Sequence, residues 1–195
     1  MRAARQSGLH VTCEVTPHHF ALTEEAVGEY DTYAKMNPPL RAAEDRDAMI
    51  EGLLDGTIDC IATDHAPHAA HEKEQEFERA PNGITGLETS LGLSLAVLHR
   101  QHGMPISQVF ALLSTRPAAL LGLAAGSLAV GAEADIVLLA STAEWAFRAS
   151  ESRSRSRNTP FDGWSLPGKV HLTLRAGQVV HGEMSFGSAR LSSAT

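Results

Sequence analysis

Residues 58–68 read Ile-Asp-Cys-Ile-Ala-Thr-Asp-His-Ala-Pro-His, an apolar run that changes abruptly into polar side chains able to bind a metal. The run is long enough for a buried strand and too short for a helix, and its β-branched residues Ile58 and Ile61 favour the strand. Pro67 cannot donate a hydrogen bond to a sheet, so the strand should end at or before it. Polar groups at the end of a buried parallel strand are typical of α/β barrels, which carry their catalytic groups at that face.

Asp64 is the first candidate functional residue. Its carboxylate could bind a metal directly, act as a general base, or do both in turn. A structural alternative is a turn in which Asp64 accepts hydrogen bonds from backbone N–H groups. Asp64, His65 and His68 lie close together in the sequence. Burying such ionisable groups costs free energy, so proteins seldom bury them together unless they serve a function. This spacing favours the functional interpretation.

The composition excludes several classes of function. The 195 residues could make one domain, or one domain with a small appendage, and their hydrophobic content of 43% is sufficient for a core. A net charge of −7 gives no basic surface for nucleic acid or an anionic membrane. No apolar run of about 18 residues predicts a membrane-spanning helix, and no secretory signal is recognisable. Cys13 and Cys60 lie in apolar strand-like runs, so we expect buried free thiols and a cytoplasmic location.

The order of elements around the 58–68 stretch predicts a pair of parallel strands. Residues 10–15 form a second candidate strand, and residues 44–55 form a helix that leads into the strand over 58–62. Strand, loop, helix and strand in this order give the βαβ arrangement. The other elements expected are the end of a helix over 1–8, short helices over 23–29, 105–113 and 117–123, a helix over 87–100, a strand over 136–139 and a hairpin of strands over 169–175 and 178–181.

A turn-rich connector over 126–135 divides the chain. We expect one unit over 1–124, a small β-strand domain over 125–183 and a flexible tail over 184–195. The charged run over 71–79 is expected to be a solvated surface segment.

The motifs of the chain resemble those of a known family. In order along the sequence they are Val-Thr-Cys-Glu-Val-Thr-Pro-His-His at 11–19, Asn-Pro-Pro-Leu-Arg at 37–41, the 58–68 stretch, and Gly-Ile-Thr-Gly-Leu-Glu-Thr at 83–89. Together they resemble class I dihydroorotases of the amidohydrolase superfamily. The stretches over 131–137 and 158–163 also look like that family, and the resemblance covers about residues 1–183.

This resemblance implies a fold, a reaction and a set of site residues. The fold would be α/β: the C-terminal part of a TIM-like (β/α)8 metal-dependent hydrolase barrel, with its last two strands and following helices, plus the strands of a small β-domain. The reaction would be the reversible cyclisation of N-carbamoyl-L-aspartate to L-dihydroorotate in pyrimidine synthesis. Asp64 would end the eighth barrel strand, bind zinc (one or two ions) and serve as catalytic acid and base. Substrate contacts would come from Asn37, His68, Asn82 and Gly83, although the position of Asn82 is commonly Phe in the family.

The family's other metal ligands, including a His-Xaa-His pair, have no counterpart in this sequence. We therefore expect the chain to be the C-terminal portion of a dihydroorotase, inactive or nearly so when isolated, because a catalytic zinc normally takes three protein ligands. His18 and His19 are not expected to bind metal, since the family's histidine ligands come from earlier strands. Their expected role is to shape the loop beside the site.

Two other functions remain open at this level. The chain could belong to a non-catalytic dihydroorotase-like subunit that supports aspartate carbamoyltransferase, or to a hydantoinase or allantoinase with another cyclic amide substrate. A homo-oligomer is also compatible with the sequence. In each case the expected ligand is a small molecule, with no role for nucleic acid or a membrane.

Overall fold

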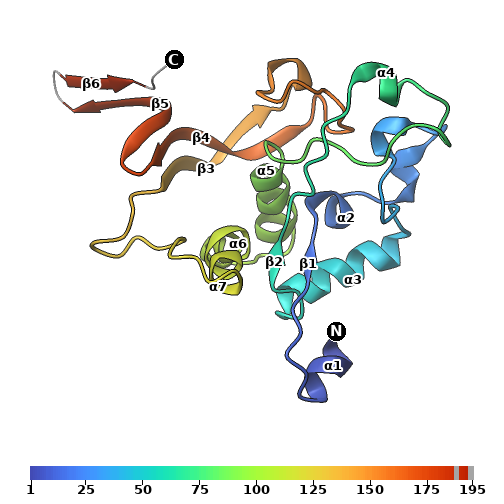
Figure 1. Cartoon of the computed structure of the whole chain (residues 1–195), viewed down its shortest axis with the longest axis horizontal. Helices are drawn as coiled ribbons and strands as arrows, with labels where there is room; N and C mark the ends of the chain where they lie inside the picture. The colour runs from blue at the N-terminus through green and yellow to red at the C-terminus, as the bar shows by residue number, and fades with distance from the viewer. Residues whose placement is uncertain (187–188, 193–195) are drawn as a thin grey trace.

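The computed structural model describes residues 1–186 and 189–192. Strands β1 (Glu14–Val15) and β2 (Cys60–Ile61) pair in parallel, with Glu14 beside Cys60. The connection between them ends in helix α3 (Ala43–Leu54), and α3 and α6 lie on opposite sides of the pair (Figure 1). The predicted βαβ arrangement is confirmed, although each strand is only two residues long.

A buried apolar cluster surrounds this pair. Val15 and Ile61 from the strands meet Ile50 of α3 and Leu98 and Leu112 of the later helices, all at most 6% exposed. The later helices come from two continuous stretches. The first joins α5 (Ser90–Ser94) to wider π-helical turns over Leu95–Gln101, and the second joins α6 (Ile106–Phe110), π-helical turns over Ala111–Thr115 and α7 (Arg116–Leu120).

Our prediction of two separate helices over 105–113 and 117–123 is therefore wrong. Pro117 lies in the first turn of α7, where the wide turns give way to α-helical geometry. A proline has no N–H to donate, and a change of hydrogen-bond pattern at this point lets the chain continue without that bond. The short elements are α1 (Arg2–Gln6), α2 (Pro17–Ala21), α4 (Ala70–Lys73) and single turns over Glu24–Val27, Thr32–Ala34 and Ala149–Glu151.

The C-terminal part forms an antiparallel sheet in the order β3 (Ile136–Ala146), β4 (Ser165–Arg175), β5 (Gln178–Phe186) and β6 (Ala189–Ser192). The predicted hairpin is confirmed: Arg175 pairs with Gln178 across Ala176 and Gly177, both at positive φ. Pairing continues further than predicted, because β6 lies in the stretch expected to be a flexible tail. Of that stretch, residues 187–188 and 193–195 lie outside the described part.

Helix α5 joins the sheet to the rest of the molecule. A Cβ on Gly92 would stand 2.8 Å from the Leu166 side chain of β4, so the glycine permits close packing of helix on strand. Leu93 of α5, Leu166 and Phe161 belong to a second buried cluster that reaches Met36, in the loop between the turn over Thr32–Ala34 and α3. This cluster holds the sheet against the loops that carry the candidate site.

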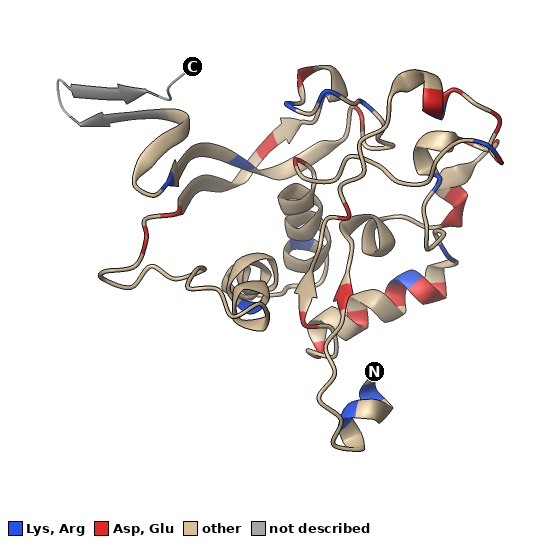
Figure 2. Ribbon diagram, viewed as in Figure 1, with Lys and Arg blue, Asp and Glu red and all other residues tan. Residues whose placement is uncertain are grey.

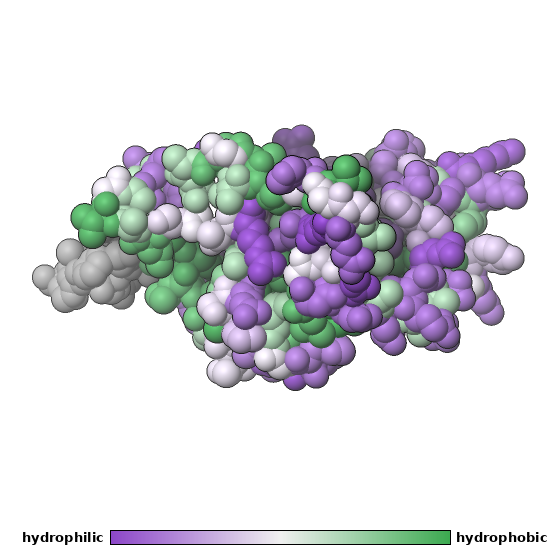
Figure 3. Space-filling model, turned by 90° about the horizontal axis from the view of Figure 1, so that it is seen from below, coloured by the Kyte–Doolittle hydropathy of each residue, from purple (hydrophilic) through white to green (hydrophobic). Residues whose placement is uncertain are grey.

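Charged and apolar residues occupy different parts of the surface. Charged residues are concentrated along α3 and in the loops near α4 (Figure 2). The opposite end, with β3, β4 and the segment after α7, is more hydrophobic (Figure 3). Leu121, Leu128 and Val130 in that segment are exposed. None of the helices in the described part has the length and hydropathy that crossing a membrane requires.

Candidate active site

Asp64 lies three residues beyond β2, in a left-handed backbone conformation with φ of 47°. Its side chain is exposed to solvent. The hydrogen bonds of this stretch are made by its neighbours His65 and His68, and within residues 1–186 and 189–192 the Asp64 carboxylate makes none. The structural alternative, a turn held by this carboxylate, is therefore ruled out. Strained backbone of this kind is characteristic of functional sites, and here it occurs at a residue that lines a cavity.

A cavity of about 480 Å³ adjoins Asp64. Its wall includes Glu14 and Thr16 at the end of β1, His19, Pro38 and Arg41. The carboxyl ends of the two parallel strands thus contribute polar groups to one hollow, as expected for a site at the end of a parallel sheet. None of the four predicted substrate-binding residues lines this cavity.

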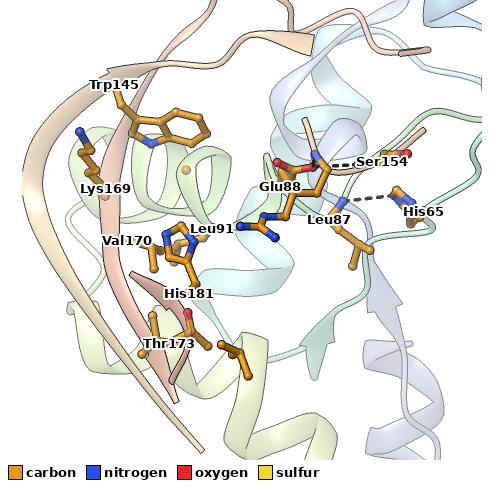
Figure 4. A pocket seen from close by; sticks show the side chains of 15 residues that line it. His65, Leu87, Glu88, Leu91, Trp145, Ser154, Lys169, Val170, Thr173 and His181 are labelled. Atoms are coloured by element: carbon orange, nitrogen blue, oxygen red, sulfur yellow. Dashed lines mark hydrogen bonds between the residues drawn. The ribbon is translucent and has the colours of Figure 1, made fainter. Parts of the chain in front are cut away.

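His65 is fixed by the backbone of the following loop. Its Nδ1 accepts hydrogen bonds from the N–H groups of Gly86 at 3.1 Å and Leu87 at 3.4 Å. The proton of the neutral imidazole must then be on Nε2. His65 also lines a larger cavity of about 860 Å³ between α5 and the sheet, where Figure 4 shows it beside Leu87.

The predicted substrate-binding residues lie on two neighbouring loops. His68 donates through Nε2 to the Asn82 carbonyl at 2.9 Å, so these two residues are in contact. The Gly83 N–H donates to the Lys35 carbonyl at 2.8 Å, which brings Gly83 close to the segment that leads to Asn37. Both asparagine side chains are exposed. The structure therefore groups His68, Asn82 and Gly83, with Asn37 on the adjoining loop.

His19 holds the loop beside the site. Thr16 Oγ1 lies 2.6 Å from its Nδ1, and its Nε2 donates to the Pro38 carbonyl at 2.9 Å, so both ring nitrogens are engaged. This is the loop-shaping role that the sequence predicts. His18 is 2% exposed, and burial, followed by the neighbouring His19 ring, lowers its pKa to about 3.

Two buried polar residues near the site were missed by the sequence analysis. Lys73 is completely buried, and desolvation, together with the charge of Lys35, lowers its pKa to about 8. The prediction that 71–79 is a solvated surface segment is therefore wrong at Lys73. Asn158 is 1% exposed and lies among the same loops. Lys73 was missed because the charged residues around it predict an exposed segment. Asn158 lies in the 158–163 stretch, for which the only signal in the sequence is its resemblance to the family.

The described residues do not complete a metal site. Within 1–186 and 189–192, no three His, Cys, Asp or Glu side chains gather closely enough to hold a metal ion. A catalytic zinc takes three protein ligands. The free carboxylate of Asp64 is suited to be one of them, and the described part of the chain supplies no full set.

Gly83 provides a test of how tightly the site loops are packed. Its φ is 106°, and a Cβ there would stand 2.6 Å from the Ala66 side chain. We expect Gly83→Ala to lower the free energy of unfolding by about 1–3 kcal/mol more than Gly56→Ala, because overpacking adds to the cost of a positive φ. Gly56 also has positive φ but open space around it. Urea unfolding of both variants measures the difference, and equal losses would contradict the tight packing.

Comparison with known proteins identifies the family of this chain. The model of the amidohydrolase family matches residues 1–180. Dihydroorotases from Geobacter sp. (strain M21) and Desulfotalea psychrophila are 51% and 53% identical to the chain over 93% and 91% of its length. The chain spans only 42% of the length of each.

Solved structures agree with this match. L-hydantoinase (dihydropyrimidinase) from Arthrobacter aurescens superposes with a TM-score of 0.86 at 30% identity, over 98% of this chain and 44% of that one. Dihydropyrimidinase from Brevibacillus agri NCHU1002 gives 0.86 at 26%, over 93% and 41%. These neighbours confirm the predicted α/β fold of amidohydrolase type. Because the family model matches residues 1–180, nearly the whole of this chain, the chain belongs to the amidohydrolase family.

Proposed function

We propose that this chain is part of a dihydroorotase, which interconverts N-carbamoyl-L-aspartate and L-dihydroorotate in pyrimidine synthesis. The observation that carries the proposal is the free carboxylate of Asp64 at the end of β2, in a chain about half identical to dihydroorotases. The hydantoinase-type neighbours are at most 30% identical, which favours dihydroorotate over hydantoin as substrate.

Asp64 would move the proton of the reaction. In the hydrolytic direction water adds to the ring amide carbon, Asp64 accepts its proton, and the C–O bond forms. Asp64 then returns the proton to the ring nitrogen as the C–N bond breaks. Its oxygens are exposed and make no hydrogen bond within the described part of the chain, which suits both steps, because a general acid or base must reach the reacting atoms directly.

The family is generally metal-dependent. We propose zinc, as one or two ions, with Asp64 as the single ligand that the described residues provide; the other ligands would come from residues outside them. The metal would supply a polarised carbonyl and a more acidic water.

Asn37, His68, Asn82 and Gly83 are the proposed substrate contacts. The Gly83 N–H is already bonded to Lys35, and the Asn82 carbonyl to His68. The exposed side chains of Asn37 and Asn82 are therefore the groups best placed to approach a bound ring.

The proposed architecture follows from the same resemblance. β1 and β2 would be the last two strands of a (β/α)8 barrel within residues 1–124, and residues 125–183 would form the small β-domain. Parallel pairing of β1 with β2 and the helices that follow support the assignment. Cys13 and Cys60 are free thiols, which supports a cytoplasmic location.

A direct comparison tests the function. The 195-residue chain and the same chain with the residues encoded upstream in its reading frame are assayed with dihydroorotate, hydantoin and allantoin, and their zinc is measured. We expect the longer form to hydrolyse dihydroorotate in preference to the other two, and the shorter form to be nearly inactive. Preference for hydantoin or allantoin would refute the substrate. A longer form without zinc or turnover would instead favour a non-catalytic subunit.

A further inference from the structure

Two buried side chains converge on one carbonyl group in the proposed site. The Gly83 carbonyl accepts a hydrogen bond from Lys73 Nζ at 3.1 Å and another from Asn158 Nδ2 at 3.1 Å. Lys73 is fully buried, and Asn158 is 1% exposed. Burying an ammonium group and a primary amide is costly unless each finds partners, so this convergence needs an explanation.

Asn158 links the two loops that carry the proposed substrate contacts. Its Oδ1 accepts from the His68 N–H at 3.1 Å, and its Nδ2 also donates to the Ala66 carbonyl at 2.9 Å. The Asn158 backbone carbonyl accepts from the Thr85 N–H at 2.9 Å. One side chain thus fixes the backbone before His68 and after Asn82.

Lys73 fixes the same loop from the other side. Its Nζ donates to the Pro81 carbonyl at 2.9 Å as well as to Gly83. Lys35 continues the pattern, donating to the carbonyls of Phe77 at 2.6 Å and Ala80 at 2.7 Å. Carbonyl groups of the loop over residues 77–83 therefore accept hydrogen bonds from the two ammonium groups. Asn82, in the same loop, is exposed to solvent.

We propose that Asn158 and Lys73 are positioning residues that hold the Gly83 carbonyl between them and thereby set the placement of His68 and Asn82 for the substrate. The inference rests on the proposed function for the identity of that substrate. Neither residue is exposed, so they act through the loop and do not touch the ligand.

A charge placed at residue 158 tests their proximity. The lysines of the sequence are Lys35, Lys73 and Lys169, so NMR of lysine-labelled protein can follow each amine. Asn158→Asp puts a carboxylate within two hydrogen-bond lengths of Lys73 Nζ and should raise the pKa of Lys73 above its value of about 8. Desolvation and then Lys35 lower that pKa in the unaltered protein, and Asp31 raises it. The exposed Lys169 should not respond, and Asn37→Asp, at an exposed position, should leave Lys73 unchanged. An unmoved Lys73 would overturn the proposal.

Hydrogen exchange of the unaltered chain gives a second test, which does not depend on the variant folding. The amide protons of His68 and Thr85 both donate to Asn158. They should exchange more slowly than that of exposed Gln75, whose N–H makes no hydrogen bond within the described residues. Lys73→Met should accelerate exchange across residues 81–85, whereas Lys169→Met should not. Exchange at Thr85 as fast as at Gln75 would refute the anchor.

Kinetics connect the anchor to the substrate. In the form that turns over dihydroorotate, Lys73→Met should raise KM at least about tenfold and change kcat by less than about threefold, because a displaced loop weakens binding without removing Asp64. Unchanged KM would overturn the positioning role. If the unaltered protein does not act on dihydroorotate, the proposed function fails, and the NMR and exchange results still decide whether the anchor exists.

Discussion

Replacing Asp64 with asparagine is expected to lower kcat for dihydroorotate by about 10²–10⁴-fold, the usual contribution of a general acid or base. The amide has nearly the same shape as the carboxylate but cannot accept the proton of the attacking water. Asp64 makes no hydrogen bond within the described residues, so the substitution leaves no structural partner unsatisfied. The loss should therefore appear in turnover while the free energy of unfolding stays nearly constant.

Asp47→Asn is the matched control. Asp47 lies on α3, exposed to solvent, and pairs with Arg46 at 2.7 Å. An exposed ion pair contributes at most about 1 kcal/mol, so this variant should keep both activity and stability. Steady-state assays of the form that acts on dihydroorotate, with zinc measured in parallel, make the comparison. An Asp64→Asn protein that retains activity within about tenfold of the unaltered one would exclude Asp64 as the acid and base.

The position of Asp64 could be predicted because the signals for it are local. A short β-branched run, a proline and a change to polar side chains mark the end of a strand within a few residues. The preceding helix and the strand over 10–15 add the parallel pairing that the structure confirms. Its left-handed φ of 47° could not be predicted, since nothing in the sequence distinguishes it from an extended aspartate.

The contacts around Gly83 could not be predicted because they join distant parts of the chain. Asn158 reaches Gly83 across 75 positions, and its partners are mostly backbone atoms, which leave no pattern in the side-chain sequence. Lys73 stands in a charged run whose other members are mostly exposed, so local polarity predicts a surface position. The wide helical turns before Pro117 escaped prediction for a similar reason, since a proline ordinarily indicates a helix boundary.

Acid should destabilise the protein through His18. This side chain is 2% exposed, and its pKa is lowered to about 3 from the ordinary 6.5, first by desolvation and then by His19. The unfolded chain therefore binds a proton near pH 6.5, whereas the folded chain does not bind it until about pH 3. Between these values the unfolded state carries more protons, so stability falls as the pH falls.

The size of the effect follows from the two pKa values. Each pKa unit corresponds to about 1.4 kcal/mol, so His18 contributes up to about 5 kcal/mol of stability above pH 6.5 that is lost by about pH 3. Asp55, whose pKa is lowered to about 2 by bonds to Thr57 and Arg2, acts in the same direction, but only below its ordinary value of 3.8. Glu144 also acts in this direction, because its hydrogen bonds to Arg100 and Ser165 lower its pKa from the ordinary 4.5. The interval from pH 6.5 to 5 lies above the ordinary pKa values of both carboxyls and therefore reports on the histidine.

Urea unfolding at several pH values between 7 and 5 tests the assignment. His18→Phe keeps a planar ring and cannot titrate, so its free energy of unfolding should change far less across this interval, whatever its value at pH 7. His102→Phe, at an exposed position, should keep the full pH dependence. If His18→Phe loses stability with acid as steeply as the unaltered protein, another group is responsible. Because His18 is 2% exposed, almost no water reaches the imidazole to stabilise its charge. The change in the free energy of unfolding with pH should therefore depend on this one side chain.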